Sequence, residues 1–112
     1  MMMGLNPWVI LAIAIIFEVI GTVLLKLSNG FENVGLGITA IVFYIFSFWF
    51  FAPALKFIPA GTAYAIWSGI GIALVTLISV LFLGDSLRPV QFVFIALILA
   101  GVVGLNLTTK VV

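Results

Sequence analysis

The sequence contains no cysteine and no histidine among its 112 residues. Disulfide bonds, thiolate chemistry and the usual zinc ligands are therefore excluded, and we expect neither a metal centre nor a cofactor. The chain also offers no paired nucleophile and base of the kind that hydrolytic and transfer enzymes use, which argues against an enzyme.

Charged side chains are the second scarcity. They make up 6% of the chain, whereas a soluble domain is usually about a quarter charged. Because 66% of the residues are hydrophobic, polar groups cannot cover the surface, so lipid must be the solvent. The net charge of +1 gives no reason to expect nucleic acid as a partner. The charged residues are Glu18, Lys26, Glu32, Lys56, Asp85, Arg88 and Lys110.

Four long apolar runs are separated by short connectors that carry turn residues. Each run reaches the ~18 to 20 residues that a helix needs to cross ~30 Å of hydrocarbon. The first run lacks the basic segment and cleavage site of a secretory signal peptide, so no cleavable signal is expected. We therefore predict an all-α membrane protein, with one four-helix transmembrane domain over residues 1–112. The predicted helices cover about residues 7–27, 34–55, 58–83 and 89–108.

The positive charges favour neither orientation in the membrane. Four helices put both termini on one side, together with Lys56 and Lys110, while Lys26 and Arg88 lie on the other side. Lys and Arg in short loops normally set orientation, so two against two predicts that copies insert both ways and pair antiparallel. The alternative is that four charges are too few to judge. A bundle this small has almost no interior, which also favours an oligomer with its site between protomers.

One acidic residue lies in the middle of the first apolar run. Glu18 is roughly ten residues from each end of its predicted helix, which places it near the bilayer midplane. An ionised carboxylate there costs at least ~2.5 to 3.5 kcal/mol, and no basic residue within seven positions offsets that cost. A carboxyl at this depth can exchange a proton for another cation. The alternative is a permanently protonated glutamate that is hydrogen-bonded to a neighbouring helix.

Helical periodicity places small residues on the same side of the first helix as Glu18. They leave space beside the carboxylate, either for a ligand or for a closely packed helix, and spacing alone cannot decide between the two. These residues are Ala14, Gly21 and Thr22.

Aromatic residues form faces on the second and third predicted helices. Rings beside a carboxylate suit a lipophilic cation, through charge pairing and cation–π contact, although core packing produces similar stripes. The candidate cation-binding residues on these faces are Tyr44, Ser47, Phe48, Tyr64 and Trp67, with Ser68 as a polar neighbour.

Glycine, alanine and proline indicate where helices bend or pack closely. Gly69 and Gly71, near the middle of the third helix, permit a bend, with close helix packing as the alternative. Pro53 removes a backbone donor within the second helix and should kink it. Small residues on one face of the fourth helix predict close association with another helix. These are Ala96, Ala100, Gly101 and Gly104.

Two motifs resemble the small multidrug resistance family. They are "EVIGTVLLKLSNGF" at residues 18–31 and "IPAGTAYAIWSGIGI" at residues 58–72, and they occur in order and at the family's spacing. The chain has the family's length, and the resemblance covers it from end to end. Trp8, which stands at a ligand contact of the first helix, departs from the usual residue, as do Pro53 and Phe94.

The resemblance implies an antiparallel homodimer that exchanges protons for organic cations by alternating access. It places the family's essential glutamate at Glu18 and its ligand-contacting aromatic residues at Tyr64 and Trp67. It also assigns Ser68 to the polar residues that support the glutamates, gives the third helix its bend and gives the fourth helix most of the dimer contact. The expected partners are protons, organic cations, the lipid bilayer and a second copy, in the cytoplasmic membrane of a bacterium or archaeon.

Residues within the motifs resemble the branch of the family that exports quaternary ammonium compounds. Guanidinium exporters typically carry Trp at the position of Gly21, and they read "WTGIGA" where this chain reads "WSGIGI" from Trp67 onward. We therefore predict a proton-coupled antiporter of lipophilic, aromatic and quaternary ammonium cations. Guanidinium export is an alternative, and so is a non-transporting membrane subunit of a heterodimer.

Overall fold

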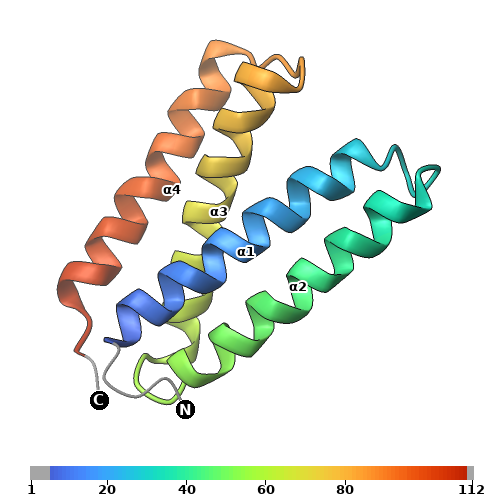
Figure 1. Cartoon of the computed structure of the whole chain (residues 1–112). Coiled ribbons are helices and arrows are strands. Elements are labelled where there is room, and N and C mark those ends of the chain that lie inside the picture. The colour runs from blue at the N-terminus through green and yellow to red at the C-terminus, as the bar shows by residue number, and fades with distance from the viewer. Residues whose placement is uncertain (1–5, 111–112) are drawn as a thin grey trace.

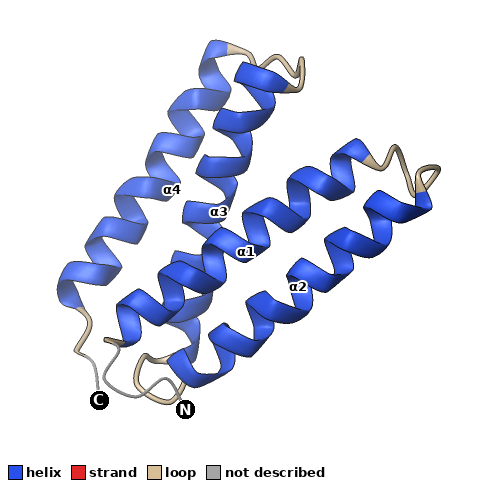
Figure 2. Cartoon of the chain, viewed as in Figure 1, coloured by secondary structure: helices blue, strands red, loops and turns tan. Residues whose placement is uncertain are grey.

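The computed structural model describes residues 6–110, which form four α-helices joined by short loops (Figure 1). The helices are α1 (Pro7–Leu27), α2 (Val34–Ala54), α3 (Ala60–Phe82) and α4 (Pro89–Thr108). Figure 2 shows that the described residues contain no strand. All four helices are long and apolar enough to cross a membrane, which confirms the prediction of a four-helix membrane protein.

Polar side chains and prolines set where the helices begin. The side chains of Asn6 and Asn33 each accept a hydrogen bond from an amide of the following first turn, at 2.8 and 3.1 Å. These N-cap bonds satisfy amides that have no partner inside the helix. α3 begins at Ala60 and not at Ile58, because Pro59 is extended (φ −52°, ψ 138°) and forms the N-cap.

The helices pack as two pairs that converge at one end. α1 packs against α2 and α3, and α4 packs against α3. The buried core lies mainly where α1 begins, α2 ends and α3 begins. From that end the α1–α2 pair and the α3–α4 pair diverge (Figure 1). The core residues are Ile10, Leu11, Ile15, Val19, Ala54, Ile58, Ala63, Ile66 and Val102.

α4 is the least covered helix. Val102 is its buried residue within the described chain. The small residues expected to contact a second copy, Ala96, Ala100, Gly101 and Gly104, are all exposed. Apart from neighbouring residues and the helix's own backbone, no described atom lies within 4 Å of a Cβ added at Gly101 or Gly104. This open face is compatible with a neighbouring helix, and the dimer contact itself stays a prediction.

Two of the residues that depart from the family pattern lie outside the core. Pro53 lies at the end of α2, and Phe94 lies on the exposed surface of α4. Pro53 is the next-to-last residue of α2, so its missing amide donor coincides with the end of the helix. Any kink at Pro53 is therefore confined to the last turn. Phe94 is 58% exposed on α4.

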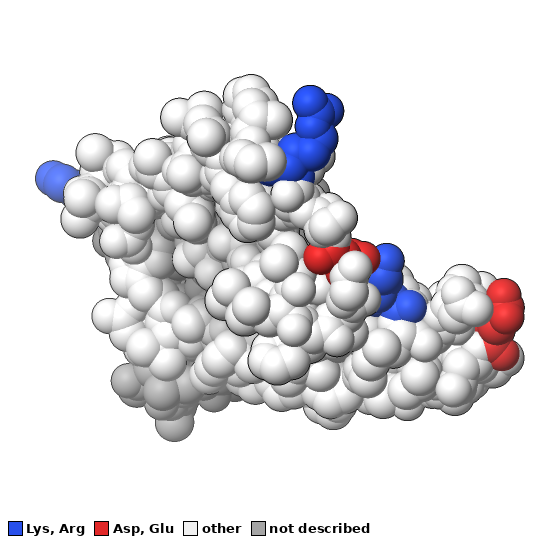
Figure 3. Space-filling model, turned by 90° about the horizontal axis from the view of Figure 1, so that it is seen from above, with Lys and Arg blue, Asp and Glu red and all other residues white. Residues whose placement is uncertain are grey.

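Charged side chains other than Glu18 lie in the loops and at the helix ends. Figure 3 shows acidic and basic groups on an otherwise uncharged surface. Lys26, in the last turn of α1, pairs with Asp85 in the α3–α4 loop, with Nζ 3.4 Å from Oδ1. Within the described residues, Glu18 is thus the one charge that the middle of the membrane has to accommodate.

Candidate functional site

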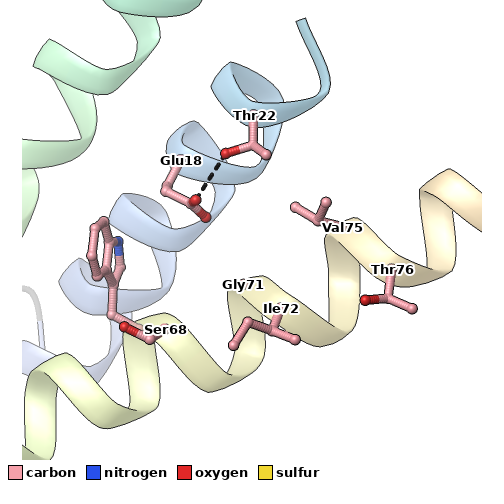
Figure 4. Close-up of a pocket in the computed structure, with 8 residues that line it drawn as sticks. Glu18, Thr22, Ser68, Gly71, Ile72, Val75 and Thr76 are labelled. Carbon is pink, nitrogen blue, oxygen red and sulfur yellow. Dashed lines mark hydrogen bonds between the residues drawn. The ribbon is translucent and has the colours of Figure 1, made fainter. Parts of the chain in front are cut away.

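A pocket of about 340 Å³ lies between α1 and α3. α1 contributes Glu18 and Thr22 to its wall, and α3 contributes the other lining residues (Figure 4). The wall combines one carboxyl, three hydroxyls and an indole with aliphatic side chains. The α3 residues are Trp67, Ser68, Gly71, Ile72, Val75 and Thr76.

The Glu18 carboxyl is held by a short chain of hydroxyl groups. The Thr22 hydroxyl donates to Glu18 Oε1 at 2.9 Å, and the Tyr44 hydroxyl lies 2.7 Å from the same Thr22 oxygen. A threonine hydroxyl has one proton to donate. When Glu18 is ionised, Thr22 donates this proton to the carboxylate, so the Tyr44 hydroxyl must be the donor in its bond with Thr22. Periodicity predicted that Thr22 lies beside Glu18, but it did not predict the bond to Tyr44.

The second oxygen of the Glu18 carboxyl is buried against α3. Glu18 Oε2 has no hydrogen-bond partner in the described chain. A Cβ atom at Gly71 would lie 2.8 Å from this oxygen, so glycine lets α3 approach the carboxyl closely. A buried polar atom without a partner costs about 1–3 kcal/mol, and more when it is charged. An ionised Glu18 therefore has one buried oxygen whose charge no hydrogen-bond donor of the described chain compensates.

Trp67 forms the aromatic wall of the pocket. Its ring stacks on Phe51 with centroids 5.0 Å apart, and it contacts Tyr64 at 5.7 Å and Phe48 at 6.3 Å. Its indole nitrogen is buried and has no hydrogen-bond partner among the described residues. Tyr64 and Phe48 are 60% and 55% exposed. The structure therefore brings Trp67 into the pocket with Glu18, and it leaves Tyr64 and Phe48 one ring further away.

Ala14, Gly21 and Ser47 hold α1 against α2 and do not line the pocket. Ser47 is fully buried, and its hydroxyl donates to the Ala14 carbonyl at 2.7 Å. A Cβ at Gly21 would lie 3.1 Å from the Tyr44 ring and 3.2 Å from a backbone oxygen of α2. The small residue at Gly21 therefore allows Tyr44 to lie close enough to bond Thr22.

Gly69 and Trp8 also occupy packing positions in this structure. A Cβ at Gly69 would meet Val102 at 2.5 Å and Ile98 at 3.1 Å, so the glycine lets α4 pack closely on α3. α3 is uninterrupted at Gly69 and Gly71, and a bend there stays a prediction. Trp8 is partly buried against the core at the start of α1 and is not among the residues that line the pocket.

Three pocket residues were not singled out from the sequence. Ile72, Val75 and Thr76 follow Ser68 at i+4, i+7 and i+8, which is the spacing of one helical face. That spacing was the available signal, and the aliphatic character of Ile72 and Val75 concealed it among the lipid-facing residues of α3.

Comparison with known proteins covers nearly the whole chain. The sequence profile of the Small Multidrug Resistance protein family matches residues 6–98. The multidrug transporter EmrE of Escherichia coli is 44% identical over 106 residues, which are 95% of this chain and 96% of the relative. The quaternary ammonium compound-resistance protein QacE of Escherichia coli is 45% identical over 106 residues, with the same two coverages. The guanidinium exporter of Yersinia pseudotuberculosis is 40% identical over 102 residues, which are 91% of this chain and 98% of that protein. With four membrane-length helices and these matches, the chain is an EmrE-like, multi-pass member of the small multidrug resistance family.

Proposed function

We propose that this protein exports lipophilic and quaternary ammonium cations in exchange for protons. It would do so by alternating access, as an antiparallel dual-topology homodimer in a bacterial cytoplasmic membrane. The observation that carries the proposal is the Glu18 carboxyl in its largely apolar pocket, with one oxygen bonded to Thr22 and the other without a partner. The names of the relatives EmrE and QacE support the same class of substrate.

Exchange follows when protons and organic cations compete for the same pair of carboxyls, one Glu18 from each copy of the dimer. An empty ionised carboxylate is costly at this depth, because little around it replaces water. A protonated Glu18 and a cation-paired Glu18 both avoid that cost. If the protein reorients in these two forms, entering protons release the cation, and an entering cation releases protons.

The aromatic wall suits the apolar part of such a cation. Trp67 lines the same pocket as Glu18, so a bound cation can pair with the carboxyl while its substituents contact the indole ring. Contact between a cation and an aromatic face contributes ~0.5–1 kcal/mol at exposed sites and ~2 kcal/mol when the cation is desolvated. Binding by charge and ring contact makes few demands on the shape of the substrate, which agrees with multidrug export.

Several features support a second copy at the site. The small-residue face of α4 is uncovered within the described chain. Tyr64, which contacts the ring of Trp67, is 60% exposed in one copy. The even split of the positive charges supports the antiparallel arrangement, since neither orientation is favoured.

Guanidinium export is the second candidate, because a relative at 40% identity carries that name. A guanidinium group directs several planar N–H donors outward and binds carboxylates best through two parallel hydrogen bonds. Glu18 Oε2 has no partner, whereas Oε1 already accepts a hydrogen bond from Thr22 and is held in that direction. This geometry favours a cation that needs charge compensation and apolar contact over one that needs several acceptors.

The test is transport by the purified chain in liposomes with an imposed pH gradient. Wild type should accumulate tetraphenylphosphonium and quaternary ammonium ions, and guanidinium poorly. Glu18→Gln should abolish the accumulation of these cations, because Gln resembles a protonated Glu but cannot ionise. Glu32→Gln, which removes an acid of the α1–α2 loop, is the matched control and should transport normally.

Undiminished transport by Glu18→Gln would contradict the proposal. Preference for guanidinium would support the second candidate. Purified wild type that binds no cation by itself would support a subunit that functions only in a heterodimer.

A further inference from the structure

A second pocket adjoins the Glu18 pocket on the side of the α3–α4 loop. Its volume is about 210 Å³, and it shares Val75 and Thr76 with the first pocket. The two pockets therefore follow one another along α3, from Glu18 toward the membrane surface. The other lining residues of the second pocket are Ser79, Val80, Asp85 and Leu87.

The turn after α3 places Asp85 at the outer end of this path. α3 ends at Phe82, and Gly84 adopts a φ of +78°, which favours glycine. The chain then turns back, so that the Asp85 amide donates to the Ser79 carbonyl at 3.1 Å. The Asp85 carboxyl is thereby kept beside the second pocket, with its side chain 41% exposed.

Lys26 of α1 pairs with Asp85 at this end of the path. Its Nζ lies 3.4 Å from Asp85 Oδ1, and its side chain is 56% exposed. Exposed ion pairs of this kind add little to stability, so an incoming cation can take the place of Lys26 at small cost. Asp85 is the one charged residue in the lining of the second pocket, as far as the described chain shows.

We propose that the second pocket is an outer binding site for the transported organic cation, with Asp85 as its counter-ion and Lys26 as the group it displaces. The inference rests on the proposed function and adds a site between water and Glu18. Its lining shares with the inner pocket one carboxyl, hydroxyls (here of Thr76 and Ser79) and aliphatic side chains, but it has no aromatic ring. The ligand class is a monovalent organic cation with apolar substituents.

An outer site of this kind affects how often a cation reaches the Glu18 pocket, and it does not affect the exchange of that cation for protons at Glu18. A carboxylate in a pocket with apolar walls raises the local concentration of cations and their rate of entry. Asp85 lies outside the membrane-spanning helices, so its loss leaves the proton exchange at Glu18 in place. The consequence is a higher KM with a maximal rate close to that of wild type.

The experiment measures benzyltrimethylammonium uptake into liposomes at several concentrations. Asp85→Asn should raise KM roughly three- to tenfold at low salt, with little change in maximal rate. The difference should shrink at ~1 M salt, because salt screens the attraction. Lys26→Gln should lower KM by removing the competing cation, and Asp85→Glu should restore most of the affinity. Glu32→Gln, an acid outside both pockets, is the control and should leave KM unchanged.

Direct binding gives a second readout. In a Glu18→Gln background, weak binding of benzyltrimethylammonium should persist, and the added Asp85→Asn should remove it. An unchanged KM in Asp85→Asn would overturn the outer site, and so would a KM raised equally by Lys26→Gln, since that result would mean that the ion pair acts as a structural tie. Either result, with Glu18→Gln inactive, would leave the proposed function intact. If the wild-type protein transported no organic cation, that result would instead contradict the proposed function itself.

Discussion

Replacement of Gly71 by alanine should weaken cation binding without unfolding the chain. A Cβ atom at this position would lie 2.8 Å from Glu18 Oε2, well inside the ~3.5 Å at which non-bonded atoms normally touch. The carboxyl is the far end of a flexible side chain, so it moves before the backbone of α3 does. Glu18 Oε2 would then leave the position in which it is available to the pocket.

The expected change in Kd can be worked out from the contact between the added methyl group and the Glu18 carboxyl. An extra methyl group in a well-packed site costs about 1–3 kcal/mol. If that cost falls on the carboxyl geometry that binds the cation, the Kd rises roughly five- to 150-fold, because ~1.4 kcal/mol corresponds to a factor of ten. Thermal unfolding should change little, because the flexible Glu18 side chain takes up the displacement and the backbone of α3 does not have to move.

The assay is calorimetric titration of tetraphenylphosphonium into the purified protein, together with transport in liposomes. Gly61→Ala, on the same helix, is the matched control, because a Cβ there meets nothing within 4 Å in the described chain. It should leave the Kd unchanged. If Gly71→Ala keeps the wild-type Kd and only slows turnover, the steric reasoning is refuted, and a bend of α3 at this glycine explains the defect instead.

Trp67→Ala should weaken the binding of aromatic cations by about 0.5–2 kcal/mol more than the binding of small aliphatic cations. An equal loss of affinity for both classes in binding assays would indicate that Trp67 has a packing role. Lysines added to residues 28–33, or beside Lys110, should bias insertion in opposite directions. Each biased form should lose transport and recover it on co-expression, so a fully active single form would contradict the antiparallel dimer. Cation affinity measured from about pH 5 to pH 9 should strengthen and then level off, because protons leave Glu18 as pH rises, and binding should release protons by linkage. A flat profile without proton release would exclude competition at Glu18.

The number and extent of the helices could be predicted because an apolar run of membrane length has few stable forms in lipid. Backbone groups have no water partner there, so a helix that bonds them internally is required. The start of α3 was the least predictable boundary. Proline suits either the first helical position or the residue before it, and Pro59 takes the second option.

Glu18, Thr22, Trp67 and Ser68 were singled out in the sequence, and the structure brings them together in one pocket. Their roles in transport stay predictions. Ser47 could not be placed by the same reasoning, because a hydroxyl on a helix face serves a ligand or a neighbouring backbone equally well. The angle between α1 and α2 decides the matter, and it depends on packing between residues far apart in sequence.

The uneven packing of the helices has a mechanical consequence. Bonds from Ser47 and Tyr44 of α2 tie that helix to α1, whereas the hydrophobic core joins the two helix pairs mainly at one end. A helix of this length spans roughly 30 Å, so a rotation of ~10° at the joined end moves the far end by about 5 Å. The Glu18 pocket lies part-way along, where the displacement is roughly half as large. A rotation of the two helix pairs by a few degrees about their joined end would therefore change access to the carboxyl without separating α1 from α2.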